Sequence, residues 1–380
     1  MDLGTTHTVL AHLGEVLTPS LADEGRETLL PSAVAYPPSG DVLIGYPARA
    51  RWPVDPRHTL LSTKRLIGAR QNSYRARRFA ERHPYEIVEH GERALIRTRA
   101  GDVDPVEVAA QLLMHACQRT ARDPGSTSTV ITIPAAFGTE ERTATLQAAR
   151  LASFALPALI EEPVATAIAY LARSNLTYGV VYDLGGGTFD IAVVDCSTEP
   201  FRVVANAGDP YLGGDDVDRE IATRVAERIL KRDRWDLRSE PEVFARLTAA
   251  CEAAKLELAE AESTEIRLSR VEPAGPFAKN PFVLEQQELR EITVSLVRRT
   301  FGLCDQVLAK AGIQSRDIQA VFLAGGSTGL PGLKEMVSEY FGRRARFDID
   351  PMHVVAIGAS LAAARPGLGA FLDQTGDAAQ

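Results

Sequence analysis

The chain contains little cysteine, little tryptophan and no long uninterrupted apolar run. Its cysteines have neither the spacing of a zinc site nor the density of a disulfide framework; they are Cys117, Cys196, Cys251 and Cys304. The apolar stretch from Val354 to Ala364 is interrupted by Gly358 and Ser360, and it is shorter than the roughly 20 residues that span a bilayer. The chain starts without a charged leader or an apolar signal core. We therefore expect a protein of the reducing cytoplasm with no membrane anchor.

Basic residues are also in deficit, because 42 lysines and arginines stand against 50 aspartates and glutamates, giving a formal net charge of -8. Proteins that bind nucleic acid usually present a basic face, so this balance argues against a nucleic-acid partner. Some of the acidic groups are instead available to hold a cation. A length of 380 residues is too great for one hydrophobic core, which predicts at least two subdomains.

Strands that end in turns and lead into helices recur along the chain, which indicates an α/β protein. Apolar spacing and the Asp104-Pro105 start predict a helix over residues 104–122. A β-branched run predicts a strand at 129–133, before a helix at 140–152. We expect the same order at 179–195, and again at 320–323, where a helix over 332–341 follows.

Two other regions differ in composition. Residues 64–83 are rich in arginine, which predicts a helix whose basic face is solvated. Between residues 215 and 296 we expect an inserted unit of long charged helices, at 216–232, at 242–261 and from Glu285 onward, with a polar segment at 263–281. The tail after Pro366 is expected to fray.

A turn motif occurs twice, about half the chain apart: Asp2-Leu3-Gly4-Thr5-Thr6 and Asp183-Leu184-Gly185-Gly186-Gly187-Thr188. Glycines let successive backbone N–H groups converge on a phosphate, and threonine hydroxyls add donors. An aspartate at the strand end can hold the waters of a Mg²⁺ that bridges phosphates. The repeat predicts two similar halves whose turns face one nucleotide. The alternative is that each motif is only a β-hairpin turn.

Further motifs make the chain resemble the ATPase domain of the 70-kilodalton heat-shock chaperones, the heat shock protein 70 or DnaK family. The resemblance covers nearly the whole chain. Besides both glycine turns, the Phe189-Asp190 extension and the third glycine turn at 324–331, it is carried by Ser62-Thr63-Lys64-Arg65-Leu66-Ile67-Gly68, Thr132-Ile133-Pro134-Ala135-Ala136-Phe137, Glu162-Pro163-Val164-Ala165-Thr166-Ala167-Ile168-Ala169-Tyr170, Leu212-Gly213-Gly214-Asp215-Asp216 and Cys251-Glu252-Ala253-Ala254-Lys255-Leu256-Glu257-Leu258.

The resemblance implies an actin-like ATPase fold of the α/β class. Such a fold has two duplicated ribonuclease-H-like lobes, each with an inserted subdomain, and the nucleotide in the central cleft. Lobe I would take residues 1–172, with its insertion at about 33–103. Lobe II would take 173–347, with a helical insertion at about 213–291, and residues 348–380 would return to lobe I.

The resemblance also implies the site residues. Lys64, Glu162, Asp190 and Thr188 would be catalytic, and Asp2 and Asp183 would organise hydrated Mg²⁺, with K⁺ as a candidate monovalent ion. The ATP or ADP would be held by Gly4, Thr5, Thr6, Gly185, Gly186, Gly187, Gly213, Gly214, Glu252, Lys255, Gly325, Gly326 and Ser327. Pro134 and Arg142 would relay the nucleotide state to the surface.

Each assignment has a plain structural alternative. Lys64 alone would be an exposed lysine on a basic helix. Glu162 would complement a helix dipole and Asp190 would be a polar strand-end residue. Glu252 and Lys255 would form a surface ion pair one helical turn apart.

The sequence departs from the family pattern on the base side and at its ends. Gly329 stands where many members have an arginine that stacks on adenine, Met352 replaces an aspartate, and Ala259 replaces a serine. These changes predict poorer nucleotide affinity or a relaxed base preference. The chain as written stops soon after Leu372 without a peptide-binding domain, and the strand that leads into Asp2 lacks its first half. We therefore expect no client clamping by this chain alone.

The resulting hypothesis is an ATP-binding, slowly ATP-hydrolysing domain of a heat-shock chaperone, which couples nucleotide state to lobe closure. The nucleotide would be its main partner, with J-domain and nucleotide-exchange co-chaperones as candidates. One alternative is a non-catalytic actin-like nucleotide-binding module that acts through partners; the presence of both Lys64 and Glu162 favours catalysis. A sugar-kinase-like phosphotransferase is disfavoured because no sugar pocket is recognisable.

Overall fold

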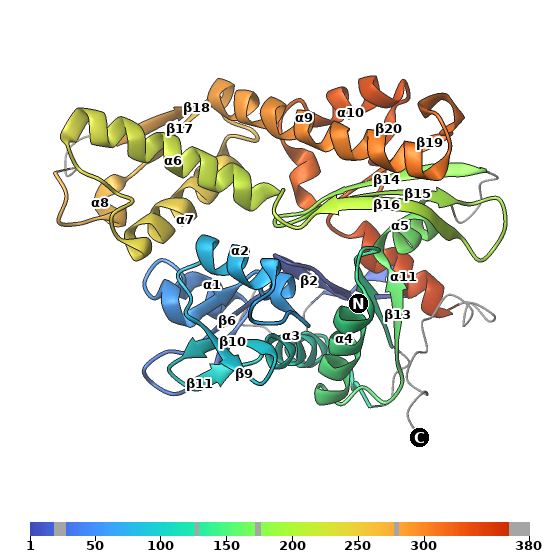
Figure 1. The fold of residues 1–380 in the computed structure, drawn as a ribbon, viewed down its shortest axis with the longest axis horizontal. Helices are drawn as coiled ribbons and strands as arrows, with labels where there is room; N and C mark the ends of the chain where they lie inside the picture. Colours follow the sequence, from blue (N-terminus) through green and yellow to red (C-terminus); the bar gives the residue numbers. More distant parts are fainter. Residues whose placement is uncertain (19–27, 126–128, 172–175, 277–280, 365–380) are drawn as a thin grey trace.

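The computed structural model describes residues 1–18, 28–125, 129–171, 176–276 and 281–364. Within these ranges, eleven α-helices and seven small or medium sheets form a mixed α/β fold, as the sequence predicts. Figure 1 shows two bodies of structure, one above the other. The lower body contains strands β1 to β13 with helices α1 to α4, and the upper body contains strands β14 to β20 with helices α6 to α10.

A five-stranded sheet forms the centre of the upper body, in the order β16-β15-β14-β19-β20. Its strands are β14 (Tyr178–Leu184), β15 (Phe189–Asp195), β16 (Arg202–Asp209), β19 (Ala320–Ala324) and β20 (Ala345–Arg346). The apolar β-branched run of β14 is buried between an antiparallel neighbour, β15, and a parallel neighbour, β19. The ends of β14 and β19 therefore lie side by side, together with the glycine turns that follow them.

Helices and a small sheet complete the upper body. The helices are α6 (Gly214–Asp233), α7 (Pro241–Glu257), α8 (Leu268–Val271), α9 (Gln286–Ala311) and α10 (Leu333–Phe341). The small sheet pairs β17 (Ser263–Ile266) with β18 (Phe282–Glu285). The long charged helices and the polar segment thus lie where the composition predicts them.

The lower body is built from short strands. These are β1 (Asp2–Leu3), β2 (His7–Val9), β3 (Ala11–His12), β4 (Glu15–Val16), β5 (Leu30–Pro31), β6 (Ala33–Ala35), β7 (Leu43–Ile44), β8 (Thr59–Leu61), β9 (Ile87–His90), β10 (Arg93–Thr98), β11 (Gly101–Val103), β12 (Thr129–Ile133) and β13 (Pro157–Glu161). Its helices are α1 (Tyr46–Arg51), α2 (Tyr74–Arg82), α3 (Pro105–Arg119) and α4 (Thr139–Leu151). The predicted strand 129–133 and the Asp104 capping box that starts α3 are both confirmed.

The two bodies repeat one local arrangement. In the lower body, β1 and β2 form an antiparallel hairpin, and the backbone N–H of Thr132 on β12 donates to the Met1 carbonyl beside it at 3.0 Å. In the upper body, β14 and β15 form an antiparallel hairpin with β19 beside it. Both predicted glycine turns are therefore hairpin turns with a further strand alongside, so the hairpin alternative describes their backbone correctly.

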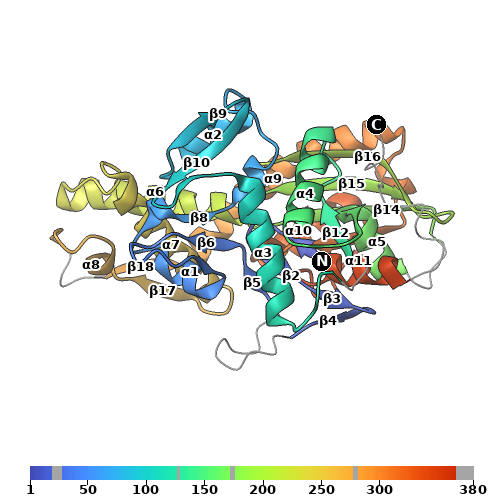
Figure 2. The ribbon, with the colours of Figure 1, turned by 90° about the horizontal axis from the view of Figure 1, so that it is seen from below.

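Helices α5 (Glu162–Leu171) and α11 (Val354–Ala364) lie between the sheets of the lower and upper bodies and contact both. Helix α11 packs along α5, and a buried cluster joins both helices to residues of β12, β14 and β19. Figure 2 places α5 and α11 next to each other, and α3 on the near side of the lower body. Because α11 also contacts β3, β4 and β12, the chain returns at its end to the lower body.

Two predicted elements are wrong. Residues 64–83 do not form one helix. A short 3-10 helix spans Thr63–Leu66, and Gly68 after it takes φ +67°. Helix α2 begins only after its N-cap, Ser73. The basic face of α2 is not simply solvated either, because Arg75 pairs with Glu141 and Arg82 with Asp216. Residues 179–195 form two strands instead of a strand and a helix.

Other expectations concern cysteines, membranes and the tail. The four cysteines are free and buried. Among the described residues, no helix combines the length and the apolar character that a bilayer crossing requires. The tail after Pro366 and the boundary at residues 172–173 lie outside the described residues.

Candidate active site

The two glycine turns lie against each other where the lower and upper bodies meet. A Cβ added at Gly187 would lie 2.6 Å from the Thr5 Cγ2 atom, and one added at Gly186 would overlap the Thr6 hydroxyl. The turns are therefore in contact, and side chains larger than hydrogen at Gly186 or Gly187 would force them apart. The structure brings together the two turns that the sequence predicts to face one ligand.

Two more glycine segments converge on the same place. The backbone N–H of Gly214 donates to the Gly185 carbonyl at 3.1 Å, so the Gly213-Gly214 loop at the start of α6 lies against the second turn. Gly325, at the end of β19, has φ +82°, and a Cβ there would lie 2.6 Å from the Asp183 Oδ1 atom. Ser327 follows on this loop and approaches Gly214. The predicted nucleoside loop thus joins the phosphate turns.

These turns enclose a cavity of about 90 Å³, here called the inner cavity. Three carboxylates, Asp2, Glu162 and Asp183, and the Lys64 ammonium line it. Asp190 does not line it, but its charge acts on Lys64. The turn residues on its wall are Gly4, Thr5, Thr6, Gly185, Gly186, Thr188, Gly325 and Gly326. Two of their N–H groups are already bonded, that of Gly185 to the Thr188 carbonyl and that of Gly325 to the Pro351 carbonyl. Its walls therefore alternate between acidic groups and the N–H and O–H donors of the turns.

Lys64 and Glu162 form a buried ion pair inside the inner cavity. The Lys64 Nζ atom lies 2.6 Å from Glu162 Oε1, and the two side chains are only 10% and 11% exposed. Burial opposes the charged form of Lys64, but Glu162, Asp2 and Asp190 together hold its pKa above the ordinary value. The alternative of an exposed lysine on a basic helix is wrong. Glu162 is also the first residue of α5, so its helix-dipole role and its contact with Lys64 coexist.

The other carboxylates crowd around this pair. Burial, followed by the charge of Glu162, raises the pKa of Asp190 to about 7, and a hydrogen bond from Thr188 opposes the rise. Burial and the charges of Glu162, Asp190 and Asp2 raise the pKa of Asp183 well above its usual value. The Thr132 hydroxyl donates to Asp2 Oδ1 at 2.7 Å and orients it. One lysine does not balance four carboxyl groups, so these groups resist ionisation together, and a cation beside them would favour their charged forms.

Glu252 and Lys255 do not form the surface pair that was the alternative for them. The Lys255 Nζ atom lies 2.9 Å from the buried Asp218 carboxylate and donates to the Gly214 carbonyl at 3.3 Å. Glu252 instead pairs with Arg49, which comes from α1 in the lower body. Both residues therefore lie at the junction of the bodies, near the glycine loops.

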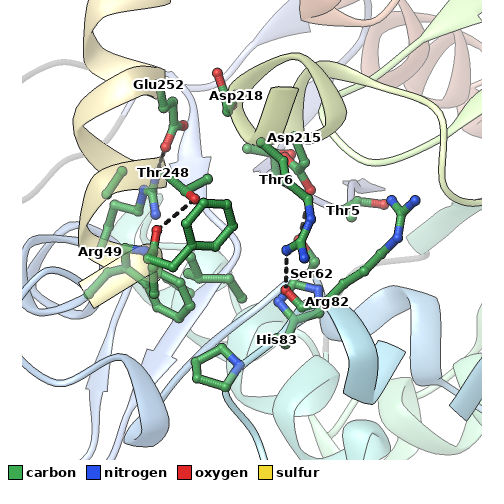
Figure 3. Close-up of a pocket in the computed structure, with 18 of the residues that line it drawn as sticks. Thr5, Thr6, Arg49, Ser62, Arg82, His83, Asp215, Asp218, Thr248 and Glu252 are labelled. Carbon is green, nitrogen blue, oxygen red and sulfur yellow. Dashed lines mark hydrogen bonds and ion pairs between the residues drawn. The ribbon is translucent and has the colours of Figure 1, made fainter. Parts of the chain in front are cut away.

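A second cavity, of about 300 Å³, adjoins the first and is here called the outer cavity. It lies between the lower body and helices α6 and α7, and Thr5 and Thr6 line both cavities. Figure 3 shows its walls, with Arg49 and Glu252 pointing toward each other and Asp215 above Ser62. No sequence motif predicted this space.

Sequence reasoning assigned no role to Arg65 or Arg49, although both contact the site. Arg65 is 4% exposed; its guanidinium donates to the Gly187 carbonyl and lies 3.1 Å from Asp215 Oδ2. A signal for Arg65 was available, since it directly follows Lys64 in a motif of the resemblance. Arg49 lies in no such motif, and its partner Glu252 is distant in sequence.

Pro134 and Arg142 lie behind the Lys64 side of the inner cavity. Arg142 donates from Nη2 to Glu161 Oε1 at 2.7 Å and from Nε to the Phe137 carbonyl at 2.9 Å. The Lys64 ammonium lies 5.9 Å from the centre of the Phe137 ring. A continuous set of contacts thus joins Arg142 to the site, while the relay role of Pro134 and Arg142 remains a prediction.

A direct metal centre is not visible in the described part of the chain. No three His, Cys, Asp or Glu side chains there come close enough together to ligate a metal ion themselves. Asp2 and Asp183 both line the inner cavity, and their role toward hydrated Mg²⁺ stays a prediction.

Comparison with known proteins gives one family. The family model described as Hsp70 protein matches residues 1–365. The chain is 34% identical to the chaperone protein DnaK of Stenotrophomonas maltophilia over 95% of its own length and 58% of that protein. It is 38% identical to the chaperone protein HscA homolog of Azotobacter vinelandii over 96% of its length and 57% of that protein. It therefore spans a little under three fifths of these curated relatives.

Proposed function

The chain belongs to the Hsp70 protein family, and from this premise we propose that it is a heat-shock-type ATPase domain that binds Mg-ATP and slowly converts ATP and water to ADP and phosphate. The observation that carries the proposal is the Lys64–Glu162 ion pair, 2.6 Å long, beside two facing glycine turns. A nucleotide-binding module without chemistry would need the turns but not a buried lysine held by a carboxylate.

In this proposal the turns hold the phosphates and Lys64 acts at the reacting end. The backbone N–H groups of Gly186 to Thr188 and the hydroxyls of Thr5 and Thr6 bind phosphate oxygens. The Gly185 N–H, which the sequence also assigned to the phosphates, already donates to the Thr188 carbonyl at 3.0 Å. An oxygen of water bonds to the terminal phosphorus while the bond from that phosphorus to the bridging oxygen of ADP breaks, and the water proton passes to the released phosphate or to solvent. Lys64 remains a cation throughout, neutralises the charge that develops and orients the water.

The acidic groups supply the second part of the proposal. Asp2, Glu162, Asp183 and Asp190 surround one lysine, so a phosphate group with its extra negative charge needs a cation beside it. Bound Mg²⁺ would supply positive charge that reduces this repulsion. We assign Asp2 and Asp183 to its waters, with K⁺ as a candidate for the remaining carboxylates, while Glu162 and Asp190 orient the attacking water.

The nucleoside would lie on the far side of the turns. We assign it to Gly213, Gly214, Gly325, Gly326 and Ser327, with Glu252 and Lys255 reaching the ribose and base. The convergence of these segments on the second turn supports the assignment. The backbone of the Gly325 loop is fixed by hydrogen bonding of its N–H to the Pro351 carbonyl at 2.9 Å, so it can serve as a rigid platform.

We also propose the actin-like architecture in full. Residues 1–172 and 173–347 would be duplicated ribonuclease-H-like lobes with insertions at about 33–103 and 213–291, and residues 348–380 would rejoin the first lobe. The repeated hairpin-plus-strand arrangement and the contacts of α11 with β12 support this division. Nucleotide state would then control lobe closure, with J-domain and nucleotide-exchange co-chaperones as partners. Four free, buried cysteines are compatible with a cytoplasmic location.

The test is single-turnover ATP hydrolysis with Mg²⁺, comparing the wild type with Lys64→Ala. We expect the cleavage rate to fall on the order of a hundredfold, because a group that stabilises developing charge is lost. Lys310→Ala is the control, since this exposed lysine donates to the Asn206 carbonyl at 3.4 Å and does not line the inner cavity. Equal cleavage in wild type and Lys64→Ala would remove Lys64 from its role. ATP binding with no cleavage by the wild type would favour the non-catalytic module.

A further inference from the structure

The two cavities meet at the hydroxyl-bearing first turn. Thr5 and Thr6 line both the inner cavity and the outer cavity, whereas Lys64 lines only the inner one. The outer cavity is more than three times larger, at about 300 Å³ against about 90 Å³. A phosphate ion beside Lys64 would therefore have the outer cavity directly behind Thr5 and Thr6.

Buried donors without partners lie at this junction. The Thr6 hydroxyl oxygen and the Nε atom of Arg65 are both buried, and neither has a hydrogen-bond partner among the described residues. Arg65 is 4% exposed and lies against the second turn, because a Cβ at Gly187 would be 2.8 Å from its Nε. A buried donor left unsatisfied destabilises the fold. One anion that passes between the cavities could accept hydrogen bonds from both groups.

The carboxylates of the outer cavity are already neutralised. Each one that lines it has a basic partner; the pairs are Glu81 with Arg78, Asp215 with Arg65, Asp218 with Lys255 and Glu252 with Arg49. These acids therefore do not close the space to an anion.

Arg219 also lines the outer cavity, and it forms no ion pair with a carboxylate of the described residues. It extends from α6 into the outer cavity, and its Nη1 donates to the Arg82 carbonyl at 3.4 Å. No carboxylate in the described part of the chain lies within ion-pair distance of it, and the Arg82–Asp216 ion pair lies beside it. The Nε2 atom of His83, also buried and without a hydrogen bond there, faces the same space. The wall opposite Thr6 therefore attracts anions.

We propose that the outer cavity is the exit route of inorganic phosphate, in which Arg65 takes the ion from Thr5 and Thr6 and Arg219 binds it before release. The inference rests on the proposed ATP hydrolysis. The loop with Gly325, Gly326 and Met352 borders the inner cavity but not the outer one, and among the proposed nucleoside contacts Glu252 alone lines the outer cavity. In this proposal an ADP held by the loop and by Glu252 leaves the Arg219 wall free for phosphate. The order of product release would then be phosphate first.

The experiment separates cleavage from release in single turnovers of Mg-ATP by the full chain. Rapid quenching measures cleavage, and a fluorescent phosphate sensor measures free phosphate. Two variants alter the route: Arg219→Gln removes its charge, and Thr248→Trp fills the outer cavity from α7. Arg224→Gln is the matched control, because this arginine lies on the same helix but pairs with Glu220 and does not line the outer cavity.

We expect normal cleavage and ADP binding in all three variants. Release of phosphate should slow on the order of tenfold in Arg219→Gln, because one hydrogen bond to a charged group is lost. Release should also slow in Thr248→Trp, because the new side chain obstructs the outer cavity. Equilibrium dialysis of radiolabelled phosphate against the ADP complex should show the same loss of affinity in Arg219→Gln but not in Arg224→Gln. This second readout does not depend on turnover.

Two results are decisive against the route. If cleavage is normal but phosphate affinity and release are the same in wild type, Arg219→Gln and Thr248→Trp, phosphate does not pass through the outer cavity. If the wild type cleaves no ATP in the quench assay, the proposed hydrolysis itself is wrong and the route falls with it.

Discussion

Arg49 on α1 and Glu252 on α7 form an ion pair across the outer cavity, and it ties the lower body to the upper body (Figure 3). The two side chains are 29% and 27% exposed, so water screens the pair only in part. Because α7 also carries the proposed nucleoside contacts Glu252 and Lys255, breaking the pair should let the bodies separate more easily around a bound nucleotide.

We predict that Arg49→Ala speeds the release of ADP by about two- to fivefold, the effect of losing a partly exposed ion pair worth up to about 1 kcal/mol. Stopped-flow displacement of a fluorescent ADP analogue measures the rate. Arg51→Ala is the control, because Arg51 lies on the same helix but contacts Asp55 within the lower body, 3.7 Å away. A release rate for Arg49→Ala no faster than that of this control would mean that the pair does not hold the bodies closed.

The buried Asp218 predicts a pH dependence of stability. Burial raises its pKa from 3.8 to about 6, against the opposing charge and hydrogen bond of Lys255. A raised pKa means that the folded state binds the proton more tightly than the unfolded state. The stabilisation is therefore complete below pH 3.8 and is lost as the pH rises through about 6.

We predict that lowering the pH from 7.5 to 5 stabilises the wild type relative to Asp218→Asn by about 1.4 kcal/mol, which follows from this shift by proton linkage. Groups common to both proteins cancel in the difference. Urea denaturation, followed by Trp235 fluorescence in a Trp52→Phe background, measures the upper body that contains Asp218. A difference in unfolding free energy that stays constant over this pH range would contradict the prediction.

Local signals explain what the sequence could predict. The glycine turns, the Asp104 cap of α3 and the β-branched strand 129–133 depend on residues close together in the chain, and all three are found. The convergence of the two turns could also be predicted, because a repeated strand and turn implies two similar halves. The family resemblance supplied the remaining site residues.

The errors have a local and a long-range source. Gly68 is a local helix-breaking residue that the arginine-rich composition outweighed in the prediction, whereas nothing near Arg75 and Arg82 in the chain shows that they find acidic partners on α4 and α6. The burial of Lys64 depends on Glu162, 98 residues away. The outer cavity exists only because α1, α2, α6 and α7 meet, and no local pattern encodes that meeting.

The base side of the site gives the last prediction. Gly329 stands where the family resemblance places an arginine that stacks on adenine, and a Cβ added there would meet no heavy atom within 4 Å. Its backbone has no positive φ that would disfavour a side chain. Gly329→Arg should therefore be accommodated. We predict that it tightens ADP binding about two- to thirtyfold, the range of a cation–π contact worth about 0.5–2 kcal/mol.

Isothermal titration with ADP measures the change, and the same titration with inorganic pyrophosphate separates base stacking from added positive charge. Stacking requires a gain for ADP and little gain for pyrophosphate, whereas a purely electrostatic effect would strengthen both. Gly302→Arg is the matched control, since that glycine on α9 also has open space around it but lies outside both cavities. Tighter ADP binding in Gly302→Arg, or none in Gly329→Arg, would show that the base does not lie beside residue 329.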